Sequence, residues 1–187
     1  LIKEVSFGND GNISQERLED CINSDLANNY GNLCQRVTAF AIKNCNGKIP
    51  LEVKFHDEDL LILNKYKDNL DNIRSQIDNQ NINFYIDYIV NSLFEANKYF
   101  NDQEPWKKKD DIIRLNTIVY TTLEIVRKIS FLLYPIIPES SLRALKIFNI
   151  EEKDIKLNTV SNNDYLTNGN KINKIDILFK KIEKNND

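Results

Sequence analysis

The sequence has 187 residues, enough for one ordinary domain that buries a hydrophobic core. Hydrophobic residues make up 41% and charged residues 28%, and five Gly and four Pro are too few for a turn-rich β-sandwich. The formal net charge of −3 argues against a protein that coats DNA non-specifically, so we expect no DNA partner. No stretch approaches the roughly 18 apolar residues that a membrane span needs, so we expect no membrane partner.

The lack of Met bears on whether the chain is complete, and the cysteine pattern bears on its cellular compartment. The sequence contains no Met, even at position 1, so we expect a piece of a longer protein. Cys21, Cys34 and Cys45 are odd in number and lack a C-x-x-C spacing, which predicts a reduced, cytoplasmic compartment. Cys34 and Cys45 are expected on one helix about 16 Å apart, too far to share a zinc ion with the single His56. We therefore expect no metal site in this chain.

Apolar residues recur at helical spacing along most of the chain. Six helices are predicted, over residues 14–23, 25–45, 57–79, 82–100, 110–133 and 138–149. Ser14 suits the first N-cap, Gly47 ends the second helix, and Pro135 cannot continue the fifth. Leu60 in the third helix and Ile112 in the fifth are expected to face inward. Long helices with short connections predict an all-α fold, an antiparallel bundle of five to six helices.

The helical pattern ends after Ile150. Residues 151–167 are polar and aperiodic, and residues 171–184 alternate basic and apolar side chains. Such a tail fits either a strand-like or an irregular arm that packs on another surface. We therefore separate a helical domain, residues 14–150, from an irregular C-terminal arm, residues 151–187.

The sequence lacks the motifs of common active sites. It has no Gly-rich phosphate loop, no H-E-x-x-H and no G-x-S-x-G. One His cannot supply the two that a di-metal carboxylate bundle needs. The many carboxylates alternate with Lys, as on a solvated helix face. We expect no catalytic residue in this chain.

One flank of the predicted helix 25–45 carries polar groups suited to binding. Asn32 and Arg36 are four residues apart and lie one above the other, and Asn29 and Lys43 continue the same flank. Amide and guanidinium groups can both bind base edges or phosphate. The same spacing also fits a helix–helix hydrogen bond or a solvated flank.

The single tryptophan is the second candidate for binding. Trp106 follows Pro105 in a polar break between helices and precedes three consecutive lysines, 107–109. An aromatic side chain beside a cluster of lysines suits base stacking combined with phosphate contacts. The alternative is a Trp that folds back as a lid on the end of the bundle.

Several short motifs, taken in order, make the chain resemble one protein family. They are Phe7–Gly11, Asn23–Asn28, Gly31–Arg36, Asn97–Phe100, Pro105–Trp106, Leu133–Pro138 and Gly169–Glu183. Each is short, but together they span nearly the whole chain. The sequence resembles the anticodon-binding domain of bacterial methionyl-tRNA synthetase.

The resemblance implies a parent enzyme whose catalytic part is missing here. Members activate methionine with ATP on a Rossmann-like domain and charge the tRNA whose anticodon is CAU, and neither catalytic signature occurs in this sequence. ATP, methionine and any zinc would belong to the upstream part, residues 1–13 would be the linker from it, and this chain would be inactive alone. The expected partners are the anticodon loop of methionine tRNA and the chain's own catalytic domain, on which, or on the bundle, the arm would pack.

The resemblance also implies site residues. In the family, the Asn and Arg of an N-L-x-x-R motif and a Trp after Pro contact the anticodon, and here these are Asn32, Arg36 and Trp106. Pro105 corresponds too and would set the approach of the Trp. Contacts with the tRNA backbone are expected from Lys43, Lys107, Lys108 and Lys109.

Two alternatives stay open at this point. The first is the equivalent domain of a related class I synthetase, for isoleucine, valine, leucine or cysteine, which shares the helical bundle. The second is a helical protein-interaction module that uses the apolar stripe of residues 82–100 as a docking face.

Overall fold

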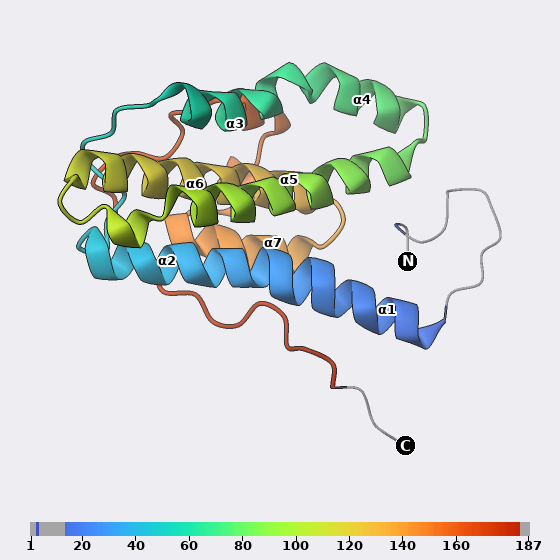
Figure 1. Ribbon diagram of the computed structural model, residues 1–187. Coiled ribbons are helices and arrows are strands. Elements are labelled where there is room, and N and C mark those ends of the chain that lie inside the picture. The colour runs from blue at the N-terminus through green and yellow to red at the C-terminus, as the bar shows by residue number, and fades with distance from the viewer. Residues whose placement is uncertain (1–2, 4–13, 184–187) are drawn as a thin grey trace.

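The computed structural model describes Lys3 and residues 14–183 as an all-α antiparallel bundle, which confirms the predicted fold class (Figure 1). The α-helices are α1 Gln15–Cys21, α2 Asn32–Asn44, α3 Asp57–Asp68, α4 Leu70–Asp78, α5 Ile82–Gln103, α6 Ile112–Leu133 and α7 Pro138–Leu145. Helices α5 and α6 run antiparallel through the middle, with α3 and α4 on one side and α2 and α7 on the other. The predicted linker, apart from Lys3, and the motif Phe7–Gly11 lie outside the described residues.

The first two predicted helices form one continuous helical run, so the predicted break at Ser24 is wrong. A ten-residue π-helix, Ile22–Gly31, joins α1 directly to α2. Asp25, which was expected to begin a new helix, is buried and accepts hydrogen bonds from Lys3 and from the Cys21 thiol. Its carboxylate is therefore engaged by side chains instead of capping a free helix end.

The other helix boundaries shift by smaller amounts. The predicted helix 57–79 divides at Asn69, whose side-chain amide donates to the main-chain oxygen of Lys65 at 2.9 Å. Helix α5 continues three residues beyond its predicted end to Gln103, and α7 gives way after Leu145 to a 3₁₀ turn, residues 146–148. The last turn tightens in the way that helix ends commonly do.

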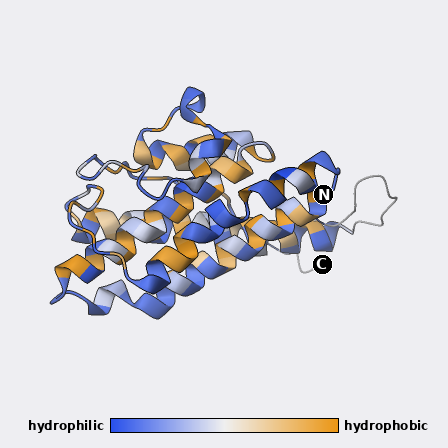
Figure 2. Cartoon of the chain, turned by 90° about the horizontal axis from the view of Figure 1, so that it is seen from above, coloured by the Kyte–Doolittle hydropathy of each residue, from blue (hydrophilic) through white to orange (hydrophobic). Residues whose placement is uncertain are grey.

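Apolar residues line the inward faces of the long helices (Figure 2). Two predicted core positions differ: Leu60 and Ile112 are 38% and 56% exposed, because each lies in the first turn of its helix at the edge of the bundle. Within the described part of the chain, no helix combines the length and the apolarity needed to cross a membrane.

Helix α6 is the centre of the core and carries charges into it. From Leu115 to Leu133 every residue except Asn116 is buried. Glu124 and Arg127 are fully buried and bond to each other at 2.5 Å. A helix that is buried all round can hold such groups only if each finds a partner.

The partners of these charges come from the polar segment after Ile150. Lys128 donates to the main-chain oxygen of Asn162 at 2.6 Å and to Asn163 Oδ1 at 3.0 Å, and it also donates to Val160. Glu124 accepts from the main-chain amide of Tyr165 at 2.7 Å. The aperiodic segment 159–166 is therefore fixed to α6 by hydrogen bonds from buried charges.

The last part of the arm follows α2 and the π-helix without forming a strand, so of the two predicted alternatives the irregular one is observed over the described residues. One isolated antiparallel bridge pairs Lys48 with Lys171. Further along, Arg143 donates to the main-chain oxygen of Ile177 at 2.7 Å, and Asn23 exchanges two hydrogen bonds with the main chain of Ile182.

The buried Lys128 makes stability depend on pH. Burial and the charge of Arg127 lower the pKa of Lys128 to about 7, whereas an unfolded Lys titrates near 10.4. Between these values the unfolded chain binds more protons, so the free energy of unfolding rises with pH. We expect wild type to gain about 2 kcal/mol from pH 7 to 9 relative to Lys128→Met, which lacks the titration. Urea unfolding of both proteins measures this, and parallel pH curves would contradict it.

Candidate nucleic-acid interface

The flank of α2 that carries Arg36 faces the C-terminal half of α5. The guanidinium donates from Nη2 to Asn101 Oδ1 at 2.6 Å, and its carbon lies 5.6 Å from the centre of the Phe100 ring. Phe40, one turn further along α2, meets Phe100 edge-on at 5.9 Å. Arg36 is thus held in place by an aromatic face and an amide while it stays half-exposed.

The connection between α5 and α6 brings Trp106 into contact with Phe100. Glu104 ends α5 in the left-handed conformation, with φ of 45°, which is costly for any residue with a Cβ. The chain then turns through buried Pro105 into a 3₁₀ turn. The Trp106 ring lies 6.1 Å from Phe100 at 71°, and 39% of the side chain stays exposed. Trp106 is therefore packed against Phe100 and partly open to solvent.

Amide groups continue the interface toward the π-helix. Asn97 of α5 donates to Asn29 Oδ1 at 2.5 Å, and the amide nitrogen of Asn29 is buried without a hydrogen-bond partner. Asn32, one turn before Arg36, is exposed, and no described residue hydrogen-bonds its side chain. The structure thus brings Arg36 and Trp106 together on Phe100, with the Asn32 amide free for a ligand beside them.

The predicted backbone-contact lysines differ in how free they are. Lys107 forms an ion pair with Glu104 at 2.7 Å. Lys43, Lys108 and Lys109 are exposed and form no ion pair with any described residue. Positive charge at this end of the bundle is therefore concentrated on side chains that solvent or a ligand can reach.

A buried ionic cluster fixes the corner that carries Trp106. Asp59, fully buried at the start of α3, accepts two hydrogen bonds from Arg114 of α6, at 2.5 and 3.1 Å, and one from Tyr99 of α5. Arg114 also donates to Gln103, the last residue of α5, at 2.5 Å. Burial acts to raise the pKa of Asp59, but the hydrogen bonds from Arg114, Tyr99 and the main-chain amide of His56 outweigh it and hold this pKa below its usual value. Three helices are thereby tied together beside residues 104–111.

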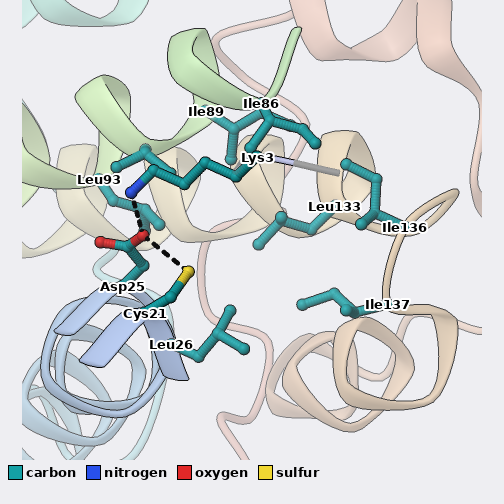
Figure 3. Close-up of a pocket in the computed structure, with 11 residues that line it drawn as sticks. Lys3, Cys21, Asp25, Leu26, Ile86, Ile89, Leu93, Leu133, Ile136 and Ile137 are labelled. Atoms are coloured by element: carbon teal, nitrogen blue, oxygen red, sulfur yellow. Dashed lines mark hydrogen bonds and ion pairs between the residues drawn. The ribbon is translucent and has the colours of Figure 1, made fainter. Parts of the chain in front are cut away.

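An apolar pocket lies away from this interface. It has a volume of about 360 Å³ and lies between α1, the π-helix, the first half of α5 and the residues that follow α6 (Figure 3). Lys3 and Cys21 point at Asp25 on its rim, and isoleucines, leucines and Val90 form the rest of the wall. None of the predicted site residues lines it.

The described residues offer no group of three or more His, Cys, Asp or Glu side chains that could hold a metal ion. The three cysteines are free thiols, and burial raises the pKa of Cys45 to about 11. The thiols of Cys34 and Cys45 are therefore protonated at neutral pH.

The site therefore combines a guanidinium and a half-exposed Trp on one aromatic ring, which are groups of the kind that bind unstacked RNA bases in RNA-binding proteins. Comparison with known proteins defines the family. Residues 49–187 match the family model described as the anticodon binding domain of methionyl tRNA ligase. The methionine–tRNA ligase of Thermotoga maritima is 35% identical over 185 residues, which is 98% of this chain and 29% of that protein. That of Mycobacterium leprae is 37% identical over 166 residues, 86% of this chain and 31% of that protein.

A solved structure agrees over nearly the whole chain. The apo form of Mycobacterium tuberculosis methionyl-tRNA synthetase superposes with a TM-score of 0.90 at 32% identity, covering 97% of this chain and 37% of that one. The chain therefore belongs to the family of anticodon-binding domains of methionyl-tRNA ligases, and the family resemblance seen in the sequence is confirmed. It spans about 30% of the length of the curated relatives it matches.

Sequence reasoning missed two parts of the interface. It placed Phe100 in the core stripe, not as the ring that contacts both Arg36 and Trp106. The position of Phe100 shortly before Pro105–Trp106 was the one feature of the sequence that could have indicated this contact. The cluster of Asp59 and Arg114 left no signal, because the two residues are 55 positions apart in the sequence.

The ionic cluster predicts strong dependence on a single carboxylate. Asp59→Asn removes the buried counter-ion of Arg114 and leaves it only the half-exposed Glu58, so we expect the free energy of unfolding to fall by about 3–5 kcal/mol. Because the folded pKa of Asp59 is depressed, its contribution is present above the unfolded pKa near 4 and is lost as pH falls through the folded value. Urea unfolding between pH 3 and 7 should therefore show a flatter pH dependence in the variant.

A matched control is available on the same arginine. Glu58 is half-exposed and pairs with Arg114 at 3.2 Å, so Glu58→Gln should cost less than about 1 kcal/mol. Equal losses of unfolding free energy in the two variants would show that the buried Asp59–Arg114 pair contributes no more to stability than the half-exposed Glu58–Arg114 pair.

Proposed function

We propose that this chain recognises the CAU anticodon of methionine tRNA, as the anticodon-binding part of a cytoplasmic class I ligase that charges that tRNA with methionine using ATP. Family membership supports the ligase and its tRNA as partner. In this proposal residues 14–150 form the binding domain, residues 1–13 lead from the catalytic domain, and residues 151–187 are an arm. Catalytic groups, ATP, methionine and any zinc belong to the part of the enzyme outside this chain.

The observation that carries the proposal is the pair of Arg36 and Trp106 on Phe100. Sequence-specific RNA recognition stacks splayed loop bases on aromatic side chains and binds their edges. Trp106 has open surface for one base, and its packing against Phe100 keeps the ring in position before RNA binds. Preorganised side chains lose little freedom on binding, which favours affinity.

Arg36 would bind the edge of a base stacked beside Trp106. Its guanidinium already donates to Asn101, and the fork has five N–H donors in all, so donors remain for a base. The O2 and N3 atoms of cytosine accept hydrogen bonds, which suits a guanidinium. Asn32, one turn away, offers a donor and an acceptor to a neighbouring base, and Pro105 fixes the backbone that carries the Trp.

Lysines around this pair would contact the RNA backbone. Lys43, Lys108 and Lys109 are exposed and free of ion pairs to described residues, whereas Lys107 would have to leave Glu104 or bind phosphate beside it. Local charge of this kind supplies phosphate contacts in a protein whose net charge is −3.

Two RNA stem-loops that differ only in the anticodon, CAU or GAU, test the proposal. We expect wild type to prefer CAU and to keep this preference when the salt concentration is raised, because base contacts depend less on salt than phosphate contacts do. Trp106→Ala and Arg36→Ala should each weaken CAU binding by about 1–3 kcal/mol. Fluorescence anisotropy measures the affinities, and circular dichroism checks that helix content is unchanged.

Conservative variants distinguish the loss of a specific interaction from the loss of side-chain volume. Trp106→Phe keeps an aromatic face and should retain most of the affinity. Arg36→Lys keeps the charge but loses the planar fork, so it should lose the CAU preference while its salt dependence stays near that of wild type. Equal binding of both stem-loops by wild type, or full binding by both alanine variants, would refute the assignment of this site.

A further inference from the structure

A second cationic surface lies at the same end of the bundle, where the arm meets the end of α2. The cleft has a volume of about 540 Å³, and its walls include Lys48, Lys171 and Lys174 together with Ile42, Asn46 and Asn173. No carboxylate lines it. Asp176, two residues beyond Lys174, is the nearest acidic residue along the arm.

The backbone forces two of these lysines together. Lys48 and Lys171 are partners in the antiparallel bridge, so their side chains project on the same side at neighbouring positions. Hydrogen bonds on both sides of the bridge fix this register, from Ile172 to Gly47 and from Ile49 to Asn170, each at 2.8 Å. Like charges placed opposite each other destabilise such a pair, and a bound anion would relieve the repulsion.

The lysines are available to a ligand. Lys48, Lys171 and Lys174 are exposed, and none forms an ion pair with a described residue. Exposed lysines without an ion pair also occur elsewhere in the described chain, as Lys54 and Lys67 show, but here three of them surround one cleft that no carboxylate lines. A concentration of unpaired positive charge in a chain of net charge −3 indicates a local site for a polyanion.

Geometry connects the cleft to the Arg36–Trp106 site. Lys43 follows Arg36 by seven residues, two helical turns or about 10 Å along the same flank of α2. Its neighbour Ile42 lines the cleft. A path of unpaired positive charge therefore leads from the site of base recognition, along the end of α2, to the first residues of the arm.

We infer that Lys48, Lys171 and Lys174 form a phosphate-binding subsite for the backbone of the same RNA whose bases meet Arg36 and Trp106; this inference rests on the proposed function. The subsite contributes affinity without sequence preference, because phosphate contacts position a nucleic acid and base contacts specify it. It also gives the C-terminal arm a role in binding in addition to its packing on the bundle.

The test compares two triple variants of the 187-residue chain. In the first, Lys48, Lys171 and Lys174 are replaced by Gln. The control replaces Lys54, Lys67 and Lys156, three exposed lysines that do not line the cleft, and changes the net charge equally. All six lysines are exposed, so both variants should keep the helix content of wild type. Loss of the repulsion between Lys48 and Lys171 should leave the urea midpoint of the cleft variant equal to or above that of wild type.

Binding of the CAU and GAU stem-loops is measured across a series of salt concentrations. The cleft variant should lose about tenfold or more in affinity for both RNAs at low salt, with the ratio between them unchanged. The plot of log K against log salt has a negative slope, and its magnitude should be smaller by about 2 in the cleft variant, because each phosphate contact contributes about 0.7–0.9. The control variant should match wild type in both affinity and slope.

The outcomes separate the cleft from the anticodon site. A wild-type CAU preference with no loss in the cleft variant overturns the subsite and leaves the proposed function intact. In a second outcome, the cleft variant binds RNA more weakly and with a weaker salt dependence, while wild type shows no CAU preference. That result supports the subsite and overturns the anticodon assignment. Absence of binding to either RNA at low salt overturns both.

Discussion

The buried ion pair of Asp59 and Arg114 is the constraint on which the binding end of the molecule depends. It joins the start of α3 to the start of α6 and, through Tyr99 and Gln103, to the end of α5. Removing two charges from water is expensive, so such a pair persists only where its geometry and additional hydrogen bonds compensate. Here they do, and the corner that carries Trp106 is fixed by directional bonds in addition to apolar packing.

The other half of the bundle uses buried charge for a different purpose. Glu124, Arg127 and Lys128 lie on the most buried helix and bond to main-chain groups of residues 159–166. Val160 and Leu166 of this segment are buried in the core, and hydrogen bonds to charged side chains hold its polar main-chain groups. This attachment brings the arm back toward the end of α2, where Lys171 pairs with Lys48.

The electrostatic design explains how an acidic chain can serve a polyanionic partner. Several carboxylates of the described surface pair with nearby lysines, whereas Lys43, Lys108 and Lys109 at the recognition site and Lys171 and Lys174 in the arm form no ion pair with a described residue. Charges separated by more than about 8–10 Å are largely screened at physiological salt, so a local positive surface acts despite the net charge. In the proposed function, a base stacked on Trp106 would add an attraction that salt does not screen.

The sequence by itself determined the all-α fold, most helix boundaries to within a few residues and the family, because helical periodicity and short motifs are local properties of the chain. It also placed Arg36 and Trp106 among the candidate binding residues. Only the tertiary structure decided that Phe100 joins them and that Asp59 meets Arg114. It decided as well that Asp25 lies inside a continuous helix and that Lys48 lies opposite Lys171. These contacts join residues that are distant in sequence or depend on burial, and neither periodicity nor spacing encodes which distant groups meet when the helices pack.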